Sequence, residues 1–188
     1  MKEIQMEPTE FRAFPKIARL NRDIIITEKI DGTNAAIGVT KEGVAYAQSR
    51  TRIITPENDN FGFAGWVKKN ADLLVDTLGV GLHFGEWWGL GIQRGYGLVE
   101  RRFSLFNASK WVEPLPLAAL RVVPVLYEGP MSTAAIEEAL DLLRFTGSFA
   151  EPGYMKPEGI VIFHTGGLNN MFKVTLENDD KPKGGDLA

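Results

Sequence analysis

Apolar and polar positions alternate along much of the chain in a way that predicts β-strands. Runs rich in β-branched and other apolar residues occur at 24–30, 33–40, 44–49, 82–87, 102–107, 121–127, 158–164 and 170–176. Short turns join most of these runs, and the second and third form a hairpin across residues 41–43. The pattern therefore predicts an α+β fold with antiparallel sheets, and it argues against a doubly wound parallel sheet.

Two other segments repeat their apolar residues with the period of a helix. In residues 61–78 the predicted buried face consists of Phe63, Trp66, Val67, Leu73, Leu74 and Leu78. Residues 132–145 predict a second helix with Ser132 as its N-cap, and its apolar stripe is Ala135, Ile136, Ala139, Leu140 and Leu143. Both helices are expected to flank the sheets.

The length and composition narrow the class of protein. A chain of 188 residues is enough for one domain with its own core, so we expect a single domain over 1–188, ending in a polar tail at 177–188. The absence of cysteine excludes disulfides, thiolate zinc sites and cysteine nucleophiles, and two histidines are too few for a histidine-rich metal site. Without a membrane-length apolar run or a secretory signal, a cytoplasmic protein is expected.

The formal net charge is -3, from 21 basic and 24 acidic residues. Proteins that capture nucleic acid at long range usually carry a strong basic field. A nucleic-acid partner of this chain would therefore have to be held by a local groove.

The segment Thr27–Asn34 (TEKIDGTN) contains the most informative candidate chemistry. Lys29 ends an apolar strand, and strand alternation places it on the opposite face from Glu28 and Ile30, with Asp31 returning to its side. A lysine at the mouth of a buried sheet can be held as a neutral amine by desolvation and neighbouring cations, and a neutral amine is a nucleophile. The alternative is a surface lysine beside an Asp-Gly turn.

Five further short motifs follow this segment. They are Ser49–Arg52 (SRTR), Phe84–Trp87 (FGEW), Phe103–Asn107 (FSLFN), Glu158–Ile162 (EGIVI) and Met171–Val174 (MFKV). The series resembles, in order, nucleotidyl-transfer motifs I, Ia, III, IIIa, IV and V of the covalent nucleotidyltransferases, which include ATP-dependent RNA and DNA ligases and capping enzymes. Glu28 and the Thr33-Asn34 extension most resemble the phage-type RNA ligase 2 branch. The resemblance covers about residues 24–177.

This resemblance implies a fold, an activity and partners. The fold would be the ATP-grasp-like nucleotidyltransferase core, with antiparallel sheets, flanking helices and an ATP cleft between them. The protein would be a monomeric ATP-dependent RNA ligase reduced to its catalytic domain, without a C-terminal accessory domain. It would use ATP and Mg²⁺ (or Mn²⁺) to join 3′-hydroxyl and 5′-phosphate ends of RNA (or DNA) through a lysyl-AMP intermediate. A separate partner could supply end binding.

The resemblance also implies roles for individual residues. Lys29 would attack the α-phosphorus of ATP, and Arg50 would clamp phosphate or the RNA terminus. Arg52, expected on the same strand face, could substitute for Arg50, although a pair of solvated strand arginines is the alternative. Glu86 would bind the ribose hydroxyls, and Glu158 would bind the metal directly or through water.

Further residues would contact the nucleotide. Phe106 would stack on the adenine, with plain core packing as the alternative. Glu28 would lie beside the adenine and accept a hydrogen bond from it through the backbone carbonyl. The remaining members of the nucleotide site would be Asp31, Gly32, Asn34 near the phosphates or metal, and Lys173 at the α-phosphate.

The chain departs from the family pattern at three places. Asn107 stands where motif IIIa often has aspartate, and Thr175 stands where motif V usually has a second lysine, unless Lys181 or Lys183 folds back to replace it. Motif VI is absent. These departures leave open a non-catalytic nucleotide- or RNA-end-binding module, and a small DNA ligase or generic adenylyltransferase is another alternative.

The glycine-dense segment Trp87–Tyr96 has no role in this scheme. Its aromatic residues and Arg94 could bind single-stranded RNA ends by stacking and charge. Equally, the tryptophans could belong to the core and the glycines to turns.

Overall fold

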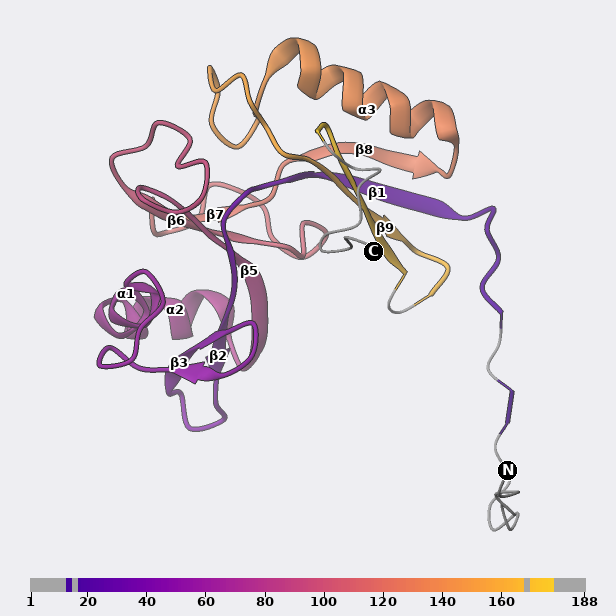
Figure 1. Ribbon diagram of the computed structural model, residues 1–188. Coiled ribbons are helices and arrows are strands. Elements are labelled where there is room, and N and C mark those ends of the chain that lie inside the picture. The colour runs from indigo at the N-terminus through magenta and orange to yellow at the C-terminus, as the bar shows by residue number, and fades with distance from the viewer. Residues whose placement is uncertain (1–12, 15–16, 168–169, 178–188) are drawn as a thin grey trace, which may run out of the picture.

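The computed structural model describes residues 13–14, 17–167 and 170–177. Ten strands and three helices occur in these residues (Figure 1). In chain order they are β1 (Asp23–Lys29), β2 (Thr33–Val39), β3 (Ala45–Ser49), β4 (Ile53–Ile54), α1 (Phe63–Lys69), α2 (Ala71–Leu78), β5 (Gly81–Gly89), β6 (Arg101–Leu105), β7 (Leu120–Val122), β8 (Val125–Pro130), α3 (Thr133–Thr146), β9 (Gly159–His164) and β10 (Met171–Thr175).

The strands form two sheets. One has four strands in the order β10-β9-β1-β8, and the other has six in the order β4-β3-β2-β5-β6-β7. Every pairing is antiparallel except that of β6 with β7. The predicted α+β class with antiparallel sheets is therefore confirmed. One predicted strand, 121–127, is divided between β7 and β8.

The six-stranded sheet packs one face against α1 and α2. Phe63 and Leu74 from these helices are fully buried, together with Phe103 of the sheet. The sequence predicted a single helix over 61–78, but the structure has two. At Asn70 the backbone leaves the helical conformation, and the Asn70 N–H and side-chain amide both bond to the carbonyl of Trp66. The break turns Leu73 outward, so its predicted burial was wrong.

The four-stranded sheet packs one face against α3 (Figure 1). Ile26 and Ile160 are fully buried there against Leu143. The predicted second helix and its cap are confirmed, because the Ser132 hydroxyl accepts a hydrogen bond from the Ala135 N–H at 3.1 Å. The opposite face of this sheet is left for Lys29 and its neighbours.

The chain crosses between the two sheets twice, at β1–β2 and at β7–β8. The second crossing divides the predicted strand 121–127, because Pro124 has no N–H to continue a ladder. The carbonyl of Pro124 instead accepts a hydrogen bond from the Glu28 N–H at 2.9 Å. A small apolar cluster seals the junction: Ile30, Trp88, Tyr96 and Val123.

Two sequence predictions concern the ends of the chain and the membrane. Of the predicted polar tail 177–188, only Glu177 is described, so Lys181 and Lys183 lie outside the described residues. None of the helices seen in the described part of the chain is long and apolar enough to cross a membrane.

Candidate active site

Lys29 and Glu158 form an ion pair at the centre of the candidate site. The Lys29 Nζ lies 2.6 Å from Glu158 Oε2, and the two side chains are 24% and 15% exposed. Lys29 ends β1 and pairs with Gly159, the first residue of β9, so sheet register places Glu158 beside it. The structure thus joins predicted motifs I and IV across 129 residues of sequence.

Glu86 lies next to this pair on the six-stranded sheet. Its pKa is raised from 4.5 to about 7, chiefly because burial disfavours the carboxylate. Lys29 and the Gly32 N–H lower this pKa, whereas Glu158 and Asp31 raise it. Asn34 is the cross-strand partner of Glu86 on β2. Four predicted site residues, Lys29, Asn34, Glu86 and Glu158, therefore converge.

The turn after Lys29 requires a glycine because it packs against β5. A Cβ on Gly32 would lie 2.5 Å from the Trp87 carbonyl oxygen and 2.8 Å from the Trp88 Cβ. The Asp31 carboxylate receives a hydrogen bond from Arg94 Nε at 3.1 Å, and the Asp31 N–H donates to the Tyr96 hydroxyl at 2.9 Å. These contacts give Asp31 and Gly32 a local structural role. Their contact with the nucleotide stays a prediction.

Glu28 points to the opposite side of β1 from Lys29, as strand alternation predicted. Its buried carboxylate accepts hydrogen bonds from the Ser148 hydroxyl at 2.6 Å and from the Phe149 and Ala150 N–H groups at 2.7 and 2.9 Å. Burial raises the pKa of Glu28, and these three hydrogen bonds oppose the rise. The side chain thus fastens the loop after α3 to β1, while the predicted carbonyl contact with adenine stays a prediction.

Phe106 lies just after β6 and is 41% exposed. Its N–H bonds to the carbonyl of Phe84, which is also exposed. The core-packing alternative for Phe106 is therefore wrong, and an aromatic face is available for a ligand. Asn107 follows it, and its carbonyl oxygen accepts hydrogen bonds from the Lys110 and Trp111 N–H groups.

Lys173 lies on β10, two strands from Lys29. Val161 pairs with Lys173, and Gly159 pairs with both Lys29 and Thr175. Because paired residues share a face and side chains alternate along a strand, Lys173 and Lys29 project from the same face of the four-stranded sheet. Lys173 is exposed there.

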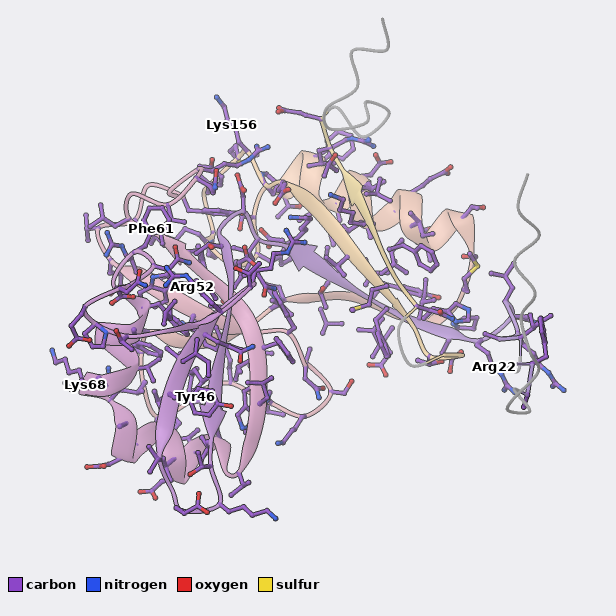
Figure 2. The ribbon with its side chains drawn as sticks, turned by 60° about the horizontal axis from the view of Figure 1, so that its bottom comes forward. Arg22, Tyr46, Arg52, Phe61, Lys68 and Lys156 are labelled. Atoms are coloured by element: carbon purple, nitrogen blue, oxygen red, sulfur yellow. The ribbon has the colours of Figure 1, made fainter. Side chains whose placement is uncertain are left out.

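The two candidate arginines lie in a turn and not on a strand. β3 ends at Ser49 and β4 begins at Ile53, and the Ser49 N–H closes the turn by bonding to the Arg52 carbonyl. Arg50 and Arg52 are both exposed, so the expectation of a shared strand face was wrong. Figure 2 shows Arg52 on the half of the molecule built on the six-stranded sheet, far from Arg22 at the outer end of β1.

The segment Trp87–Tyr96 contributes to the core and not to a stacking surface. Trp87, Trp88 and Tyr96 are almost fully buried. The Trp87 indole N–H donates to the Phe61 carbonyl and the Trp88 indole N–H donates to the Ser104 hydroxyl, both at 2.9 Å. The alternative of core tryptophans and glycine turns is therefore correct, and stacking on RNA ends by these rings is not.

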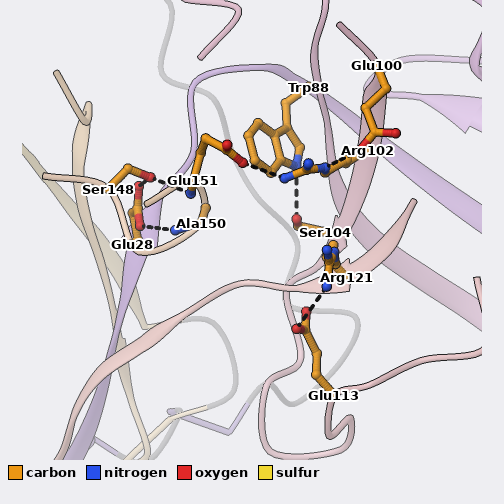
Figure 3. A network of polar contacts seen from close by, with 10 residues as sticks. All are labelled: Glu28, Trp88, Glu100, Arg102, Ser104, Glu113, Arg121, Ser148, Ala150 and Glu151. Carbon is orange, nitrogen blue, oxygen red and sulfur yellow. Dashed lines mark hydrogen bonds and ion pairs between the residues drawn. The ribbon is translucent and has the colours of Figure 1, made fainter. Parts of the chain in front are cut away.

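A cavity of about 550 Å³ has a charged wall that sequence reasoning did not single out. Arg102 bridges Glu100 at 2.8 Å and Glu151 at 2.6 Å, and its guanidinium lies over the Trp88 ring (Figure 3). Only the adjacent arginines 101–102 marked this wall in the sequence. The cavity is lined by Trp88, Arg102, Ser104, Glu113, Arg121, Val122, Val123, Pro124, Val125, Phe149, Ala150, Glu151 and Pro152.

The donor set fits a divalent cation that keeps much of its water. Within the described residues there is no group of three or more acidic or histidine side chains that could hold a metal. Mg²⁺ commonly binds through only one or two carboxylates. Glu158 and Glu86 offer two. Burial is the main cause of the raised pKa of Glu86 and the charge of Glu158 adds to it, so a nearby cation would favour the ionised carboxylates.

Comparison with solved structures identifies the fold. A lysine-to-methionine variant of the Naegleria gruberi RNA ligase with AMP and Mn aligns with a TM-score of 0.54 and 19% identity, over 83% of this chain and 50% of that one. An archaeal ATP-dependent RNA ligase aligns with a TM-score of 0.55 and 19% identity, over 87% and 48%. The chain thus spans about half the length of these proteins and shares their nucleotidyltransferase fold.

Sequence comparison reaches the same family. No curated protein sequence gives a significant match. The family model described as RNA ligase matches residues 22–175, which include the candidate motifs from Lys29 to Lys173. The chain therefore belongs to the RNA ligase family.

Proposed function

We propose that this protein is an ATP-dependent RNA ligase with Lys29 as its nucleophile. The Lys29 Nζ attacks the α-phosphorus of ATP, an N–P bond forms, the bond between the α-phosphorus and its bridging oxygen breaks, and pyrophosphate leaves. The AMP then passes to the 5′-phosphate of an RNA end. Attack by the 3′-hydroxyl of a second end forms the phosphodiester bond and releases AMP.

The observation that carries this proposal is the convergence of Lys29, Glu158 and Glu86. The contact of the Lys29 Nζ with Glu158 Oε2 at 2.6 Å holds the proposed nucleophile in place. An ammonium has no lone pair, so the lysine must give up a proton before its nitrogen attacks the phosphorus. Bound at Glu158, Mg²⁺ or Mn²⁺ would supply positive charge for the phosphate oxygens.

The remaining predicted residues would complete a nucleotide site with this centre. The exposed ring of Phe106 offers a stacking surface for adenine, and Glu86 offers an acceptor for ribose hydroxyls. Asn34 lies opposite Glu86, and Lys173 projects from the same face as Lys29. Asn34, Lys173 and Arg50, the last from its exposed turn, would contact the phosphates.

Self-adenylylation provides the direct test. Incubation with ATP and Mg²⁺ should add the mass of one AMP to the intact protein, and Lys29→Ala should abolish the addition. Lys41→Ala removes a lysine from an exposed turn and is the matched control, which should take up AMP as the wild type does. Absence of an adduct on the wild type under these conditions would contradict the proposal.

Substrate assays separate RNA joining from the other candidates. Nicked RNA, DNA and hybrid duplexes should be compared with single strands, and RNA joining is the expected result. Thr175 pairs with Gly159 where the family pattern has a second lysine, which favours a nucleotide-binding module as the second candidate. Tight ATP binding without pyrophosphate release would support that module. A cytoplasmic monomer working with a separate end-binding partner completes the proposal.

A further inference from the structure

Arg94, in the glycine-rich loop between β5 and β6, connects three segments of the candidate site. Its Nε donates to Asp31 Oδ2 at 3.1 Å, and its Nη1 donates to the carbonyl of Lys156 at 3.0 Å. Its Nη2 lies 3.8 Å from Glu177 Oε2. The side chain is 25% exposed, so these contacts are partly shielded from water.

The partners of Arg94 adjoin the residues that meet at the site centre. Asp31 follows Lys29 by two residues, and Lys156 precedes Glu158 by two. One guanidinium therefore connects the chain just after the proposed nucleophile to the chain just before the proposed metal ligand. The Asp31 N–H also donates to the Tyr96 hydroxyl from the same loop, which gives the turn a second fixed point.

The loop that carries Arg94 has a defined and costly conformation. Gln93 and Tyr96 have positive φ angles of 47° and 54°, which non-glycine residues rarely adopt. Buried contacts hold this geometry: Tyr96 packs its ring 4.9 Å from Trp88 and 4.5 Å from Tyr154, measured between centroids. Arg94 is thus presented from a rigid support, as a residue that orients others requires.

We propose that Arg94 is a positioning residue for adenylylation, and this inference rests on the proposed function. Its planar guanidinium sends separate N–H groups to a carboxylate and a carbonyl, which the single ammonium of lysine cannot do in the same geometry. Arg94 fixes Asp31 relative to Lys156, and so fixes Lys29 relative to Glu158. A misplacement of about 1 Å at a reacting group can slow a reaction by about 100-fold.

The test measures single-turnover AMP incorporation by the full chain over a range of ATP concentrations. For Arg94→Gln we expect the maximal rate to fall by about 10- to 100-fold, with little change in the ATP concentration that gives half of it. The maximal rate of Arg94→Lys should lie between that of Arg94→Gln and that of the wild type. Arg22→Gln is the matched control, because Arg22 is exposed at the outer end of β1 and lies outside the loop that carries Arg94 (Figure 2). Its rate should match the wild type.

The outcomes distinguish the inference from the proposed function. No AMP incorporation by the wild type would overturn both. Incorporation by the wild type with an unchanged rate in Arg94→Gln would overturn the inference alone, as would a change confined to the half-saturating ATP concentration. If thermal melts show that Arg94→Gln does not fold, Arg94→Lys decides the matter: a lower maximal rate supports positioning, and a wild-type rate overturns it.

Discussion

Glu86 carries a carboxylate that the folded protein disfavours at neutral pH. Burial is the main reason that its pKa rises from 4.5 to about 7, and the nearby Glu158 adds to the rise, while Lys29 only partly opposes it. We consider the substitution Glu86→Gln. It removes the charge, keeps the shape, and keeps an oxygen that can accept the Gly32 N–H.

The size of the effect follows from proton linkage. Between pH 4.5 and 7 the unfolded chain has lost the Glu86 proton and the folded chain has kept it, so the free energy of unfolding falls as the pH rises. The penalty is absent below pH 4.5 and fully present above pH 7. At about 1.4 kcal/mol per pKa unit, this destabilisation reaches about 3.5 kcal/mol.

The assay compares melting temperatures of the wild type and Glu86→Gln without nucleotide across this pH range. The wild type and the variant should have the same melting temperature at the acid end of the range. Above pH 7 the variant should have the higher melting temperature, by roughly 7–14 °C for about 3.5 kcal/mol in a chain of this size. Glu128→Gln, at an exposed carboxylate on β8, is the control and should show no such pH-dependent gain.

One result would refute this reasoning. A melting-temperature difference between the wild type and Glu86→Gln that does not change with pH would mean that Glu86 ionises in the folded protein at no extra cost. If instead the gain appears, the variant should also adenylylate more slowly. The carboxylate would then be retained for ligand binding at a cost to stability, as functional sites often require.

Two other substitutions test the surroundings of the site. Glu28→Ala removes the acceptor for three hydrogen-bond donors, so urea titration should show a loss of at least about 3 kcal/mol, at about 1–3 kcal/mol per donor. Exposed Glu138→Ala on α3 should lose almost nothing, and a loss below about 1 kcal/mol for Glu28→Ala would contradict the assigned anchor. Phe106→Leu should keep the melting temperature but raise the half-saturating ATP concentration about 10-fold, because stacking on a base contributes about 1–3 kcal/mol. An unchanged ATP requirement would rule out stacking.

The sequence pattern located most strands and the centre of the site because those features are local or ordered along the chain. Alternation placed Lys29 and Glu28 on opposite faces, and the capping signal at Ser132 gave the start of α3. The helix break at Asn70 was missed because polar residues there also fit a continuous helix. Pro124 was the available signal for the divided strand.

The rest of the site depends on contacts between distant segments, which residue periodicity does not contain. Arg94 binds Asp31 and Lys156, which lie 63 and 62 residues away in sequence. Arg102 and Glu151, which form the charged wall of the cavity, are likewise 49 residues apart in sequence. The arginines at 50 and 52 were expected to share a strand face because they are two residues apart, but they lie in a tight turn, where that spacing has no such meaning.

The order of strands in the four-stranded sheet has a consequence for synthesis of the protein. The six-stranded sheet is built from β2 to β7, a continuous stretch that can form as soon as it leaves the ribosome. β1 is made earlier, yet both of its neighbours, β8 and β9, come later. Both edges of the apolar strand β1 stay unpaired until β8 and β9 have been made. Pairing between strands that are far apart in sequence slows folding. A chain cut before β9 would therefore expose an aggregation-prone strand, and Lys29 would reach Glu158 only after synthesis had passed residue 158.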